Sequence, residues 1–408
     1  MNRLPALRSY FFYQMIFAIL LMSVISLAQD TVKLRTGNYF TPEQGKQELE
    51  NFSKLYSNKA EWVAIADTIK RDFLIGADLY PLPKKTPLKP IIHSRRILDG
   101  YWVENVAFES LPGFFVTGNL YGPTKKYESY AAILCPHGHF PPHPGYPGGR
   151  FRREMQIRCA CLARMGAYVF AYDMIGWGES TQFKNYNFPK SHDTFKKELE
   201  YQLWNSIRSL DFMLTLKDVD PERTGITGAS GGGTQTFDLA AVDPRVAVSV
   251  PVVQVSSFFF GGCVGESGMP VHQTGPYKTD NAIIAALFAP KPQLIISDTS
   301  DWTRYNPEIE IPYIKSVYKL FGAENKIENV HLKERHGYGV SKRFAAYKFL
   351  AEYLNLDLSA ICNKYEDRTI DESFVTIEPQ DSLLVFTKQY PRPSYAIKDI
   401  ATFKWKQR

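Results

Sequence analysis

A serine flanked by glycines stands where the chain changes from a strand pattern to a helix pattern. The segment Gly228-Ala229-Ser230-Gly231-Gly232 matches the G-x-S-x-G spacing of a nucleophile elbow. Glycine is needed on both sides because the serine backbone is strained in such a turn, and a Cβ there would clash with the adjoining strand or helix. The turn presents the hydroxyl at the C-terminal edge of a sheet, so we predict that Ser230 attacks an acyl carbon. A packing turn is the alternative, whereas a phosphate loop is excluded because no lysine follows at the required spacing.

A serine nucleophile needs a base, and the base needs an acid that orients it. Two later apolar strands end in suitable residues: the strand from residue 293 leads into Asp298 and Asp301, and the strand from residue 329 leads into His336. The order serine, aspartate, histidine along the chain is the order that hydrolases with this elbow require. We predict Asp301 as the acid because it lies deeper in its loop, and Asp298 stays the alternative.

Acyl transfer also needs two N–H donors for the oxyanion. The first is expected to be the amide of Gly231, at a helix N-terminus, and the second the amide of His139, in the loop Pro136-His137-Gly138-His139 after the first parallel strand. His137 and His139 could instead bind a metal, but no third ligand stands at a familiar spacing. We therefore predict no metal and no cofactor.

Two tryptophans and two polar residues near strand ends are candidates for substrate binding. Trp177 follows a strand end, and Trp302 directly follows the predicted acid. Exposed indoles there would stack on the apolar face of a sugar ring, with Glu266 and His272 binding hydroxyl groups. Core packing is the alternative for both tryptophans, and Glu266 is a third candidate for the acid.

Continuous apolar strands alternate with helical patterns between residues 131 and 355. Such alternation predicts the α/β class and the α/β-hydrolase fold, with a mostly parallel sheet covered by helices on both faces and ligands at the C-terminal strand ends. We expect strands at residues 131–135, 168–172, 223–228, 246–253, 293–297 and 329–333, and helices at residues 151–165, 193–216, 231–242, 307–321 and 341–355.

The segments on either side of this core are less regular. Apolar residues at three- and four-residue steps predict two helices between Pro42 and Ile75, and a linker with four prolines follows at residues 80–90. Alternating runs at 91–98, 101–109 and 114–121 indicate an antiparallel lead-in to the sheet. The tail contains strand-like pieces at 373–377 and 383–387 and no motif. We expect a signal peptide (1–28), an N-terminal helical segment and linker (29–90), a catalytic domain (91–357) and a C-terminal extension (358–408).

The first residues predict export. Arg3 and Arg8 precede an apolar run from Met15 to Leu27, and small residues precede Gln29, which is typical of a secretory signal peptide. The apolar run is shorter than the 20 or so residues of a spanning helix, so we expect a periplasmic or extracellular protein with no stable membrane association after cleavage. The five cysteines of the chain are too few and odd in number for a disulfide framework, although one bridge is possible.

Composition narrows the class of protein further. Of the 408 residues, 44% are hydrophobic and 22% are charged, as in an ordinary globular protein, which argues against disorder and against a multi-span membrane protein. The net charge of +6 is spread over the chain, without a basic cluster interleaved with aromatics. We therefore expect no nucleic-acid partner.

Four segments together resemble a known family. GASGGGTQTFDLAAVDPRV, YDMIGWGES, LIISDTSDWT and HGYG are similar to the secreted α/β-hydrolases known as acetyl xylan esterases, and more distantly to dienelactone hydrolases and prolyl-oligopeptidase-like enzymes. The resemblance covers about residues 90 to 355 and implies Ser230 as nucleophile, His336 as base and Asp301 as acid. This sequence departs from the pattern at Arg335, where a small residue is commoner before the histidine.

The residues and the resemblance predict a secreted serine carboxylester hydrolase that deacetylates a plant or algal polysaccharide or its oligosaccharides. One alternative is a prolyl-oligopeptidase-like serine peptidase, which usually carries a large gating domain, and the segment before the sheet is too short for one. The other is a non-catalytic carbohydrate-binding protein on a hydrolase scaffold. Such a protein would be expected to have lost a triad residue, whereas all three positions are filled.

Overall fold

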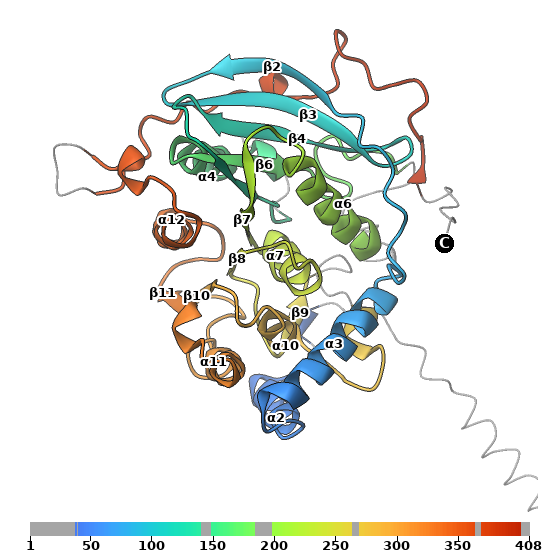
Figure 1. Cartoon of the computed structure of the whole chain (residues 1–408), viewed down its shortest axis with the longest axis vertical. Helices are drawn as coiled ribbons and strands as arrows, with labels where there is room; N and C mark the ends of the chain where they lie inside the picture. The colour runs from blue at the N-terminus through green and yellow to red at the C-terminus, as the bar shows by residue number, and fades with distance from the viewer. Residues whose placement is uncertain are drawn as a thin grey trace, which may run out of the picture. The chain divides into compact units, whose positions relative to one another are not determined.

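A nine-stranded mixed sheet forms the centre of the computed structural model, which describes residues 37–38, 40–139, 148–183, 198–262, 269–363 and 369–400 (Figure 1). The strand order is β11-β10-β8-β7-β5-β6-β4-β3-β2. Six strands are parallel: β5 (Tyr130–Leu134), β6 (Ala167–Tyr172), β7 (Val219–Ala229), β8 (Val248–Val252), β10 (Gln293–Asp298) and β11 (Ile327–Leu332). Three strands are antiparallel: β2 (Ile91–Ile97), β3 (Tyr101–Leu111) and β4 (Phe114–Pro123). The predicted parallel sheet and its antiparallel lead-in are confirmed.

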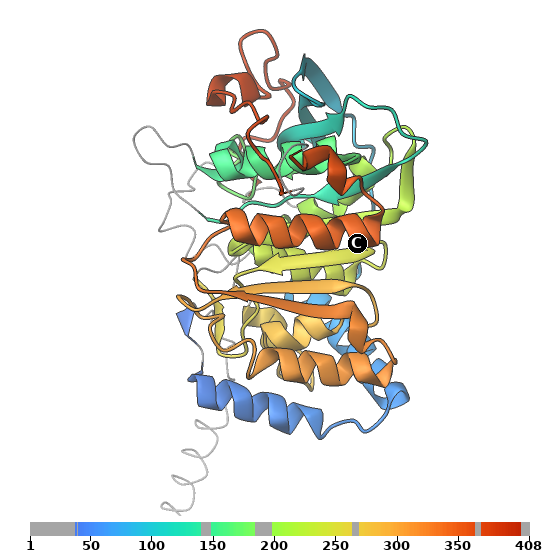
Figure 2. The same cartoon turned by 90° about the vertical axis from the view of Figure 1, so that its left-hand side faces the viewer.

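Helices cover both faces of the sheet. On one face lie α4 (Arg153–Arg164) and α12 (Val340–Leu354), and on the other lie α6 (Glu198–Met213) and α7 (Gly231–Val242), with α10 (Asn281–Ala286) and α11 (Glu310–Leu320) packed beside them (Figures 1 and 2). The alternation of side chains along a strand explains both layers: Ala131 and Ile133 belong to the core under α4 and α12, whereas Ala132 and Leu134 belong to the core under α6. The predicted α/β-hydrolase architecture is therefore correct.

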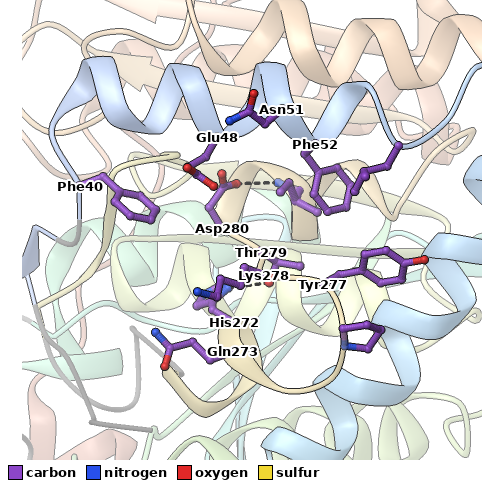
Figure 3. Close-up of a pocket in the computed structure, with 13 residues that line it drawn as sticks. Phe40, Glu48, Asn51, Phe52, His272, Gln273, Tyr277, Lys278, Thr279 and Asp280 are labelled. Atoms are coloured by element: carbon purple, nitrogen blue, oxygen red, sulfur yellow. Dashed lines mark hydrogen bonds between the residues drawn. The ribbon is translucent and has the colours of Figure 1, made fainter. Parts of the chain in front are cut away.

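The N-terminal segment forms the two predicted helices, α2 (Pro42–Ser53) and α3 (Lys59–Gly76). A capping box between Thr41 and Gln44 starts α2, and the side chain of Asn58 caps α3. Helix α2 packs on α11, and α3 packs on α7 and on the short α9 (Met269–Gln273). A pocket of about 210 Å³ lies between α2 and residues 272–283 (Figure 3).

A second, two-stranded sheet joins β1 (Gly37–Asn38) to β9 (Phe259–Gly261). It was not predicted, because three residues give no periodicity to read. The remaining elements are short: η1 (Gly149–Phe151), η2 (Glu324–Lys326), η3 (Leu358–Ile361) and α13 (Gln380–Leu383). No helix among the described residues is long and apolar enough to cross a bilayer. The predicted signal peptide at residues 1–28 lies outside them.

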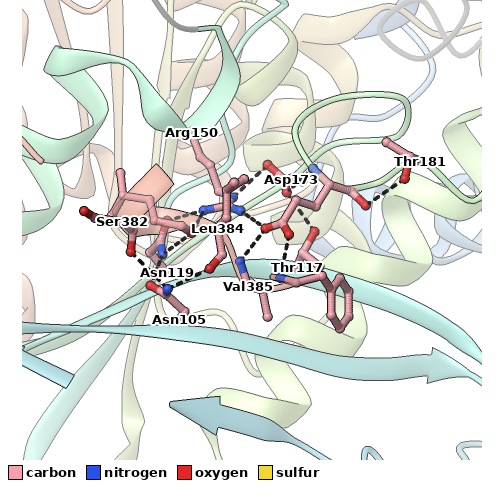
Figure 4. Close-up of polar contacts among 12 residues, drawn as sticks. Asn105, Thr117, Asn119, Arg150, Asp173, Thr181, Ser382, Leu384 and Val385 are labelled. Carbon is pink, nitrogen blue, oxygen red and sulfur yellow. Dashed lines mark hydrogen bonds and ion pairs between the residues drawn. The ribbon is translucent and has the colours of Figure 1, made fainter. Parts of the chain in front are cut away.

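The C-terminal extension differs from the prediction, because residues 373–377 and 383–387 form no strand. Their apolar side chains are packed in the cores, but the backbone groups of residues 383–386 bond to buried side chains of the hydrolase core instead of to a neighbouring strand (Figure 4). The carbonyl of Leu383 accepts hydrogen bonds from Arg150 and Asn119, and the amides of Val385 and Phe386 donate to Glu179. The alternating apolar residues therefore reflect side-chain packing and not pairing with a neighbouring strand.

Candidate active site

Ser230 occupies the turn between β7 and α7 with a strained backbone. Its φ of 58° and ψ of −126° lie in a region that residues other than glycine rarely adopt. Its amide donates to the carbonyl of Val252 at 3.0 Å, and its carbonyl accepts from the amide of Thr234, so both neighbouring elements hold the strained turn. Such strain costs about 1–3 kcal/mol and is typical of functional sites. The local geometry is that of a nucleophile elbow.

The glycines around Ser230 allow close contact with the loop after β5. A Cβ on Gly232 would lie 2.5 Å from the carbonyl oxygen of Pro136, and a Cβ on Gly228 would lie 2.6 Å from the same atom. The first turn of α7 and residues 136–139 are therefore in backbone contact. This places Gly231 beside the loop that contains His139, as the predicted oxyanion hole requires, and the roles of the two amides stay predictions.

His137 fixes that loop and is not placed as a metal ligand. Its ring is buried, with Nδ1–H donating to the carbonyl of Gly138 at 2.8 Å and Nε2 accepting from the amide of Met174 at 3.1 Å. Burial lowers the pKa of His137 to about 4, so the ring is neutral near pH 7. One donor and one acceptor nitrogen match the neutral ring. In the described part of the chain, no three His, Cys, Asp or Glu side chains come together as metal ligands.

The acid and base candidates meet in the loops after β10 and β11. Nδ1 of His336 lies 2.5 Å from Oδ2 of Asp301, whose other oxygen accepts hydrogen bonds from the amide (2.7 Å) and hydroxyl (2.6 Å) of Thr303. Asp301 is 6% exposed, and the His336 side chain is 25% exposed. A fixed, buried carboxylate and a partly accessible imidazole are suited to orient and to exchange a proton, respectively.

Asp298, the alternative acid, has another partner. Its Oδ2 lies 2.6 Å from Nζ of Lys342, and its Oδ1 accepts hydrogen bonds from the amide and hydroxyl of Ser300. Both side chains of the ion pair are fully buried. The structure therefore brings Asp301, not Asp298, to His336. Ser230, Asp301 and His336 follow strands β7, β10 and β11, which run parallel and so end at the same edge of the sheet.

The two tryptophans differ in exposure. Trp302 is partly exposed, stacks on Phe259 with ring centroids 4.0 Å apart, and lies 4.7 Å from the ring of His336. Trp177 is only 6% exposed and lies against His137 and His139, with centroids 5.8 Å apart in each case. The prediction of an exposed indole at residue 177 is therefore wrong, since the ring packs against His137 and His139 in the loop after β5.

Two acids near Trp177 form part of a buried ion-pair network. Asp173 and Glu179 both bind the guanidinium of Arg150, at 2.9 and 2.6 Å, and the Arg150 side chain is fully buried (Figure 4). A Cβ on Gly178, whose φ is +53°, would collide with the Asp173 carboxylate. The segment YDMIGWGES thus folds as a tight turn around Arg150, a role that the sequence analysis did not assign.

His272 lies away from His336. On β9, Phe259 contacts Trp302, whereas the next residue, Phe260, contacts His272 with ring centroids 4.8 Å apart. Successive strand residues point to opposite sides, so His272 faces the pocket of Figure 3 and not the acid–base pair. Its ring is buried and bonded to Thr279, and burial lowers its pKa to about 3. Glu266 lies outside the described residues.

No family model matches this chain, whereas curated proteins and solved structures do. The solved structure of "Methylesterase BT1017" is 38% identical, with a TM-score of 0.80, over 89% of this chain and 78% of that one. The structure described as "a putative acetyl xylan esterase (BF1801) from Bacteroides fragilis NCTC 9343" is 14% identical, with a TM-score of 0.52, over 77% of this chain and 86% of that one, and shows the fold. "Putative hydrolase YtaP" of Bacillus subtilis (strain 168) is 26% identical in an alignment of 267 residues, which covers 60% of this chain and 84% of that protein.

Proposed function

This chain belongs to the α/β-hydrolase family of the methylesterase BT1017 and is a carboxylic ester hydrolase, and we propose that it cleaves esters of carbohydrates with a Ser230–His336–Asp301 triad. The observation that carries the triad is the 2.5 Å contact between Nδ1 of His336 and Oδ2 of Asp301, at the sheet edge where the strained Ser230 stands.

The proposed reaction has two steps. Ser230 Oγ attacks the ester carbonyl while His336 Nε2 takes the hydroxyl proton, and the amides of Gly231 and His139 stabilise the oxyanion. The C–O bond then breaks, His336 returns the proton to the leaving alcohol, and an acyl-enzyme remains. Water, deprotonated by His336, attacks this acyl group, the bond between the acyl carbon and Ser230 Oγ breaks, and His336 returns the proton to Oγ, which releases the acid and free Ser230. Asp301 holds the imidazolium in both steps, and the reaction needs no cofactor.

Two ester classes differ in which side of the bond carries the sugar. The 38% identity to a methylesterase favours a methyl ester of a sugar acid, in which the sugar carboxyl forms the acyl-enzyme and methanol leaves. The motifs shared with acetyl xylan esterases favour the second candidate, an acetylated sugar, in which acetate is the acyl group and the sugar alcohol leaves. Trp302, beside His336, is available to stack on a sugar ring in either case.

Substrate assays test this proposal directly. The purified protein is assayed for methanol and acetate release from methyl-esterified uronate oligosaccharides, acetylated oligosaccharides and proline-ending peptides. Ser230→Ala is expected to abolish ester hydrolysis with an unchanged Tm, because a small hydroxyl contributes little to packing. Turnover by a folded Ser230→Ala variant would overturn the nucleophile assignment. Cleavage of peptides alone would favour a peptidase, and sugar binding without turnover would favour a binding protein.

We also propose that the enzyme acts outside the cytoplasm, on the grounds of the sequence of residues 1–28. Expression of the full chain followed by N-terminal sequencing of the exported protein tests this. A mature N-terminus at Gln29 is the expected result, and an intact N-terminus in the cytoplasmic fraction would contradict it.

A further inference from the structure

Two consecutive cations hold the loop that contains His336. Nζ of Lys342 donates to the carbonyl of Arg335 at 2.8 Å, and Nη1 of Arg343 donates to the carbonyl of Tyr338 at 3.0 Å. These carbonyls belong to the residue before His336 and to the second residue after it. Both sides of the histidine loop, residues 335–338, are therefore tied to the same turn of α12.

The position of these cations is electrostatically unfavourable by itself. Helix α12 begins at Val340, so Lys342 and Arg343 lie in its first turn, where the helix dipole disfavours positive charge. Both residues are also buried. A buried charge is stable only when it is paired and hydrogen-bonded. Each of these cations therefore requires a carboxylate from elsewhere in the fold.

The two carboxylates come from different parts of the chain. Asp298, at the end of β10, pairs with Lys342. Glu372, in the C-terminal extension, binds Arg343 through two hydrogen bonds, Nε to Oε1 at 2.7 Å and Nη2 to Oε2 at 2.5 Å. A planar two-point contact fixes the orientation of the guanidinium as well as its charge. The remaining Nη1 then points at the carbonyl of Tyr338.

Glu372 is itself well anchored. The hydroxyl of Tyr347, on α12, donates to its Oε1 at 2.9 Å. Two backbone contacts just before Glu372 attach the extension to the end of the hydrolase core. They are an antiparallel β-bridge between Cys362 and Ile370 and a hydrogen bond from the Asp371 amide to the Ile361 carbonyl. The carboxylate is thus held in place independently of Arg343.

Tyr338 carries the restraint toward the nucleophile. Its hydroxyl lies 2.7 Å from the hydroxyl of Thr227, on the strand that leads into Ser230, and the guanidinium of Arg158 lies 4.2 Å from the centre of its ring. Tyr338, whose carbonyl binds Arg343, therefore connects the histidine loop to the strand that leads into Ser230. A displacement of Tyr338 would move His336 relative to Ser230.

We propose that Glu372 is a positioning residue for His336, acting through Arg343 and the carbonyl of Tyr338, and that this is a function of the C-terminal extension. The inference rests on the proposed role of His336 as the base. Glu372 acts by restraining the position of the histidine loop and transfers no proton, because it touches no reacting atom. Loss of its charge lets Arg343 turn toward solvent or another acceptor, and the histidine loop loses one of its two ties to α12.

Glu372→Gln tests the proposal, with Glu378→Gln as a matched control. Glu378 is also in the extension and also binds an arginine, Arg96, at 2.5 and 3.2 Å, but that arginine is on β2 and does not touch the histidine loop. We expect Glu372→Gln to lower kcat by about 10- to 100-fold with an unchanged KM, since small misplacements of a catalytic group cost rates of that order. Glu378→Gln is expected to keep the wild-type kcat. Equal kcat values for the two variants would overturn the proposal.

A spectroscopic readout separates this proposal from the proposed function. In the full-length protein, the Nδ1 proton between His336 and Asp301 gives a downfield proton NMR resonance, assigned by its absence in His336→Gln. The expected result is a shift or broadening of this resonance in Glu372→Gln and not in Glu378→Gln. An unchanged resonance would overturn the proposal even if the wild-type enzyme hydrolysed none of the esters tested, a result that would count against the function alone.

A milder variant covers the possibility that Glu372→Gln does not fold. Tyr347→Phe removes one hydrogen bond to Glu372 and leaves the ion pair with Arg343 in place. We expect a smaller fall in kcat, with KM unchanged and the NMR resonance shifted in the same direction. A wild-type kcat and resonance in Tyr347→Phe, together with misfolding of Glu372→Gln, would assign Glu372 to stability and overturn the positioning role.

Discussion

The candidate active site has two halves, and different interactions hold each of them in place. The nucleophile half, formed by the β7–α7 turn and residues 136–139, is fixed by backbone contact at glycines and by the neutral His137. The acid–base half, formed by the loops after β10 and β11, is fixed by the buried pair Asp298–Lys342, by the partly buried pair Glu372–Arg343 and by the Asp301–His336 contact. We expect the first half to be sensitive to added volume and the second to lost charge.

Apart from removal of the nucleophile itself in Ser230→Ala, the largest effect is expected in the acid–base half, from Asp301→Asn. An asparagine can no longer hold the imidazolium of His336, and kcat is expected to fall by up to about 10⁴-fold, as in other triads. Asp298→Asn is expected to reduce kcat far less but to cost about 3–5 kcal/mol of unfolding free energy, because it leaves the buried Lys342 without its counter-charge. Kinetics and urea unfolding of the two variants distinguish the roles.

The same pair of variants can contradict the assignment. A greater loss of kcat in Asp298→Asn than in Asp301→Asn, measured on folded protein, would transfer the role of acid to Asp298. Full activity in both would direct attention to Glu266, the third candidate.

In the nucleophile half, Gly232→Ala is expected to have the next largest effect. The new Cβ would lie 2.5 Å from the carbonyl oxygen of Pro136 and 3.0 Å from the carbonyl carbon of His137, and these backbone atoms can yield only by moving the loop. We expect kcat to fall by about 10²-fold and stability by about 1–3 kcal/mol. Steady-state kinetics and thermal unfolding measure both.

Gly225→Ala, on the strand β7 that leads into Ser230, is the control for added volume. Its Cβ would meet Cδ1 of Leu354 at 2.9 Å, the end of a side chain that can rotate away. Turnover should therefore stay at the wild-type value. If kcat fell equally in both alanine variants, the effect at Gly232 could not be assigned to its contact with residues 136–139.

The smallest expected effect is a pH dependence of stability that comes from His137. Its pKa is about 4 in the folded protein and about 6.5 in an unfolded chain, so the unfolded state binds more protons between these values. The stabilisation is fully present above about pH 6.5 and is lost as the pH falls toward 4, by about 2 kcal/mol at pH 5. Urea unfolding at pH 7 and pH 5 should show a smaller difference for His137→Gln than for the wild type.

His272 provides the comparison for that measurement. It is also buried, with a folded pKa of about 3. His272→Gln should therefore also reduce the change in stability between pH 7 and pH 5, although His272 does not contact residues 136–139. Loss of kcat is expected from His137→Gln and not from His272→Gln. Parallel pH curves for the wild type and His137→Gln would show that the pKa of His137 is not lowered in the folded protein.

The regular parts of the fold could be predicted because their residues carry the signal themselves. Continuous apolar runs identified the six parallel strands, and the glycines beside Ser230 identified the turn. The role of Asp301 is a different case: depth in a loop is a weak criterion, and the geometry that brings Asp301 and not Asp298 to His336 depends on Thr303 and on Lys342. Which residues perform catalysis stays a prediction until the variants above are measured.

The contacts that were missed depend on partners far apart in the sequence. The alternation in residues 373–377 records side-chain packing but not the backbone partners, so it indicated a strand that does not form. Trp177 was expected at the surface because its distance from the loop of His137 cannot be read from the chain. One signal was available and unused: two adjacent cations, Lys342 and Arg343, in the first turn of a helix oppose the dipole and therefore call for distant carboxylates.

The contact between Arg150 and the carbonyl of Leu383 bears on how this protein can evolve. Arg150 lies at the start of the chain's first helical crossover, yet a main-chain oxygen more than 230 residues later completes its coordination. If recombination replaced the C-terminal extension by a segment with a different backbone path, the buried guanidinium of Arg150 would lose its hydrogen bond to the carbonyl of residue 383. The C-terminal extension and the hydrolase core are therefore expected to be inherited together, and a gene fragment ending at residue 357 should yield a chain that cannot fold.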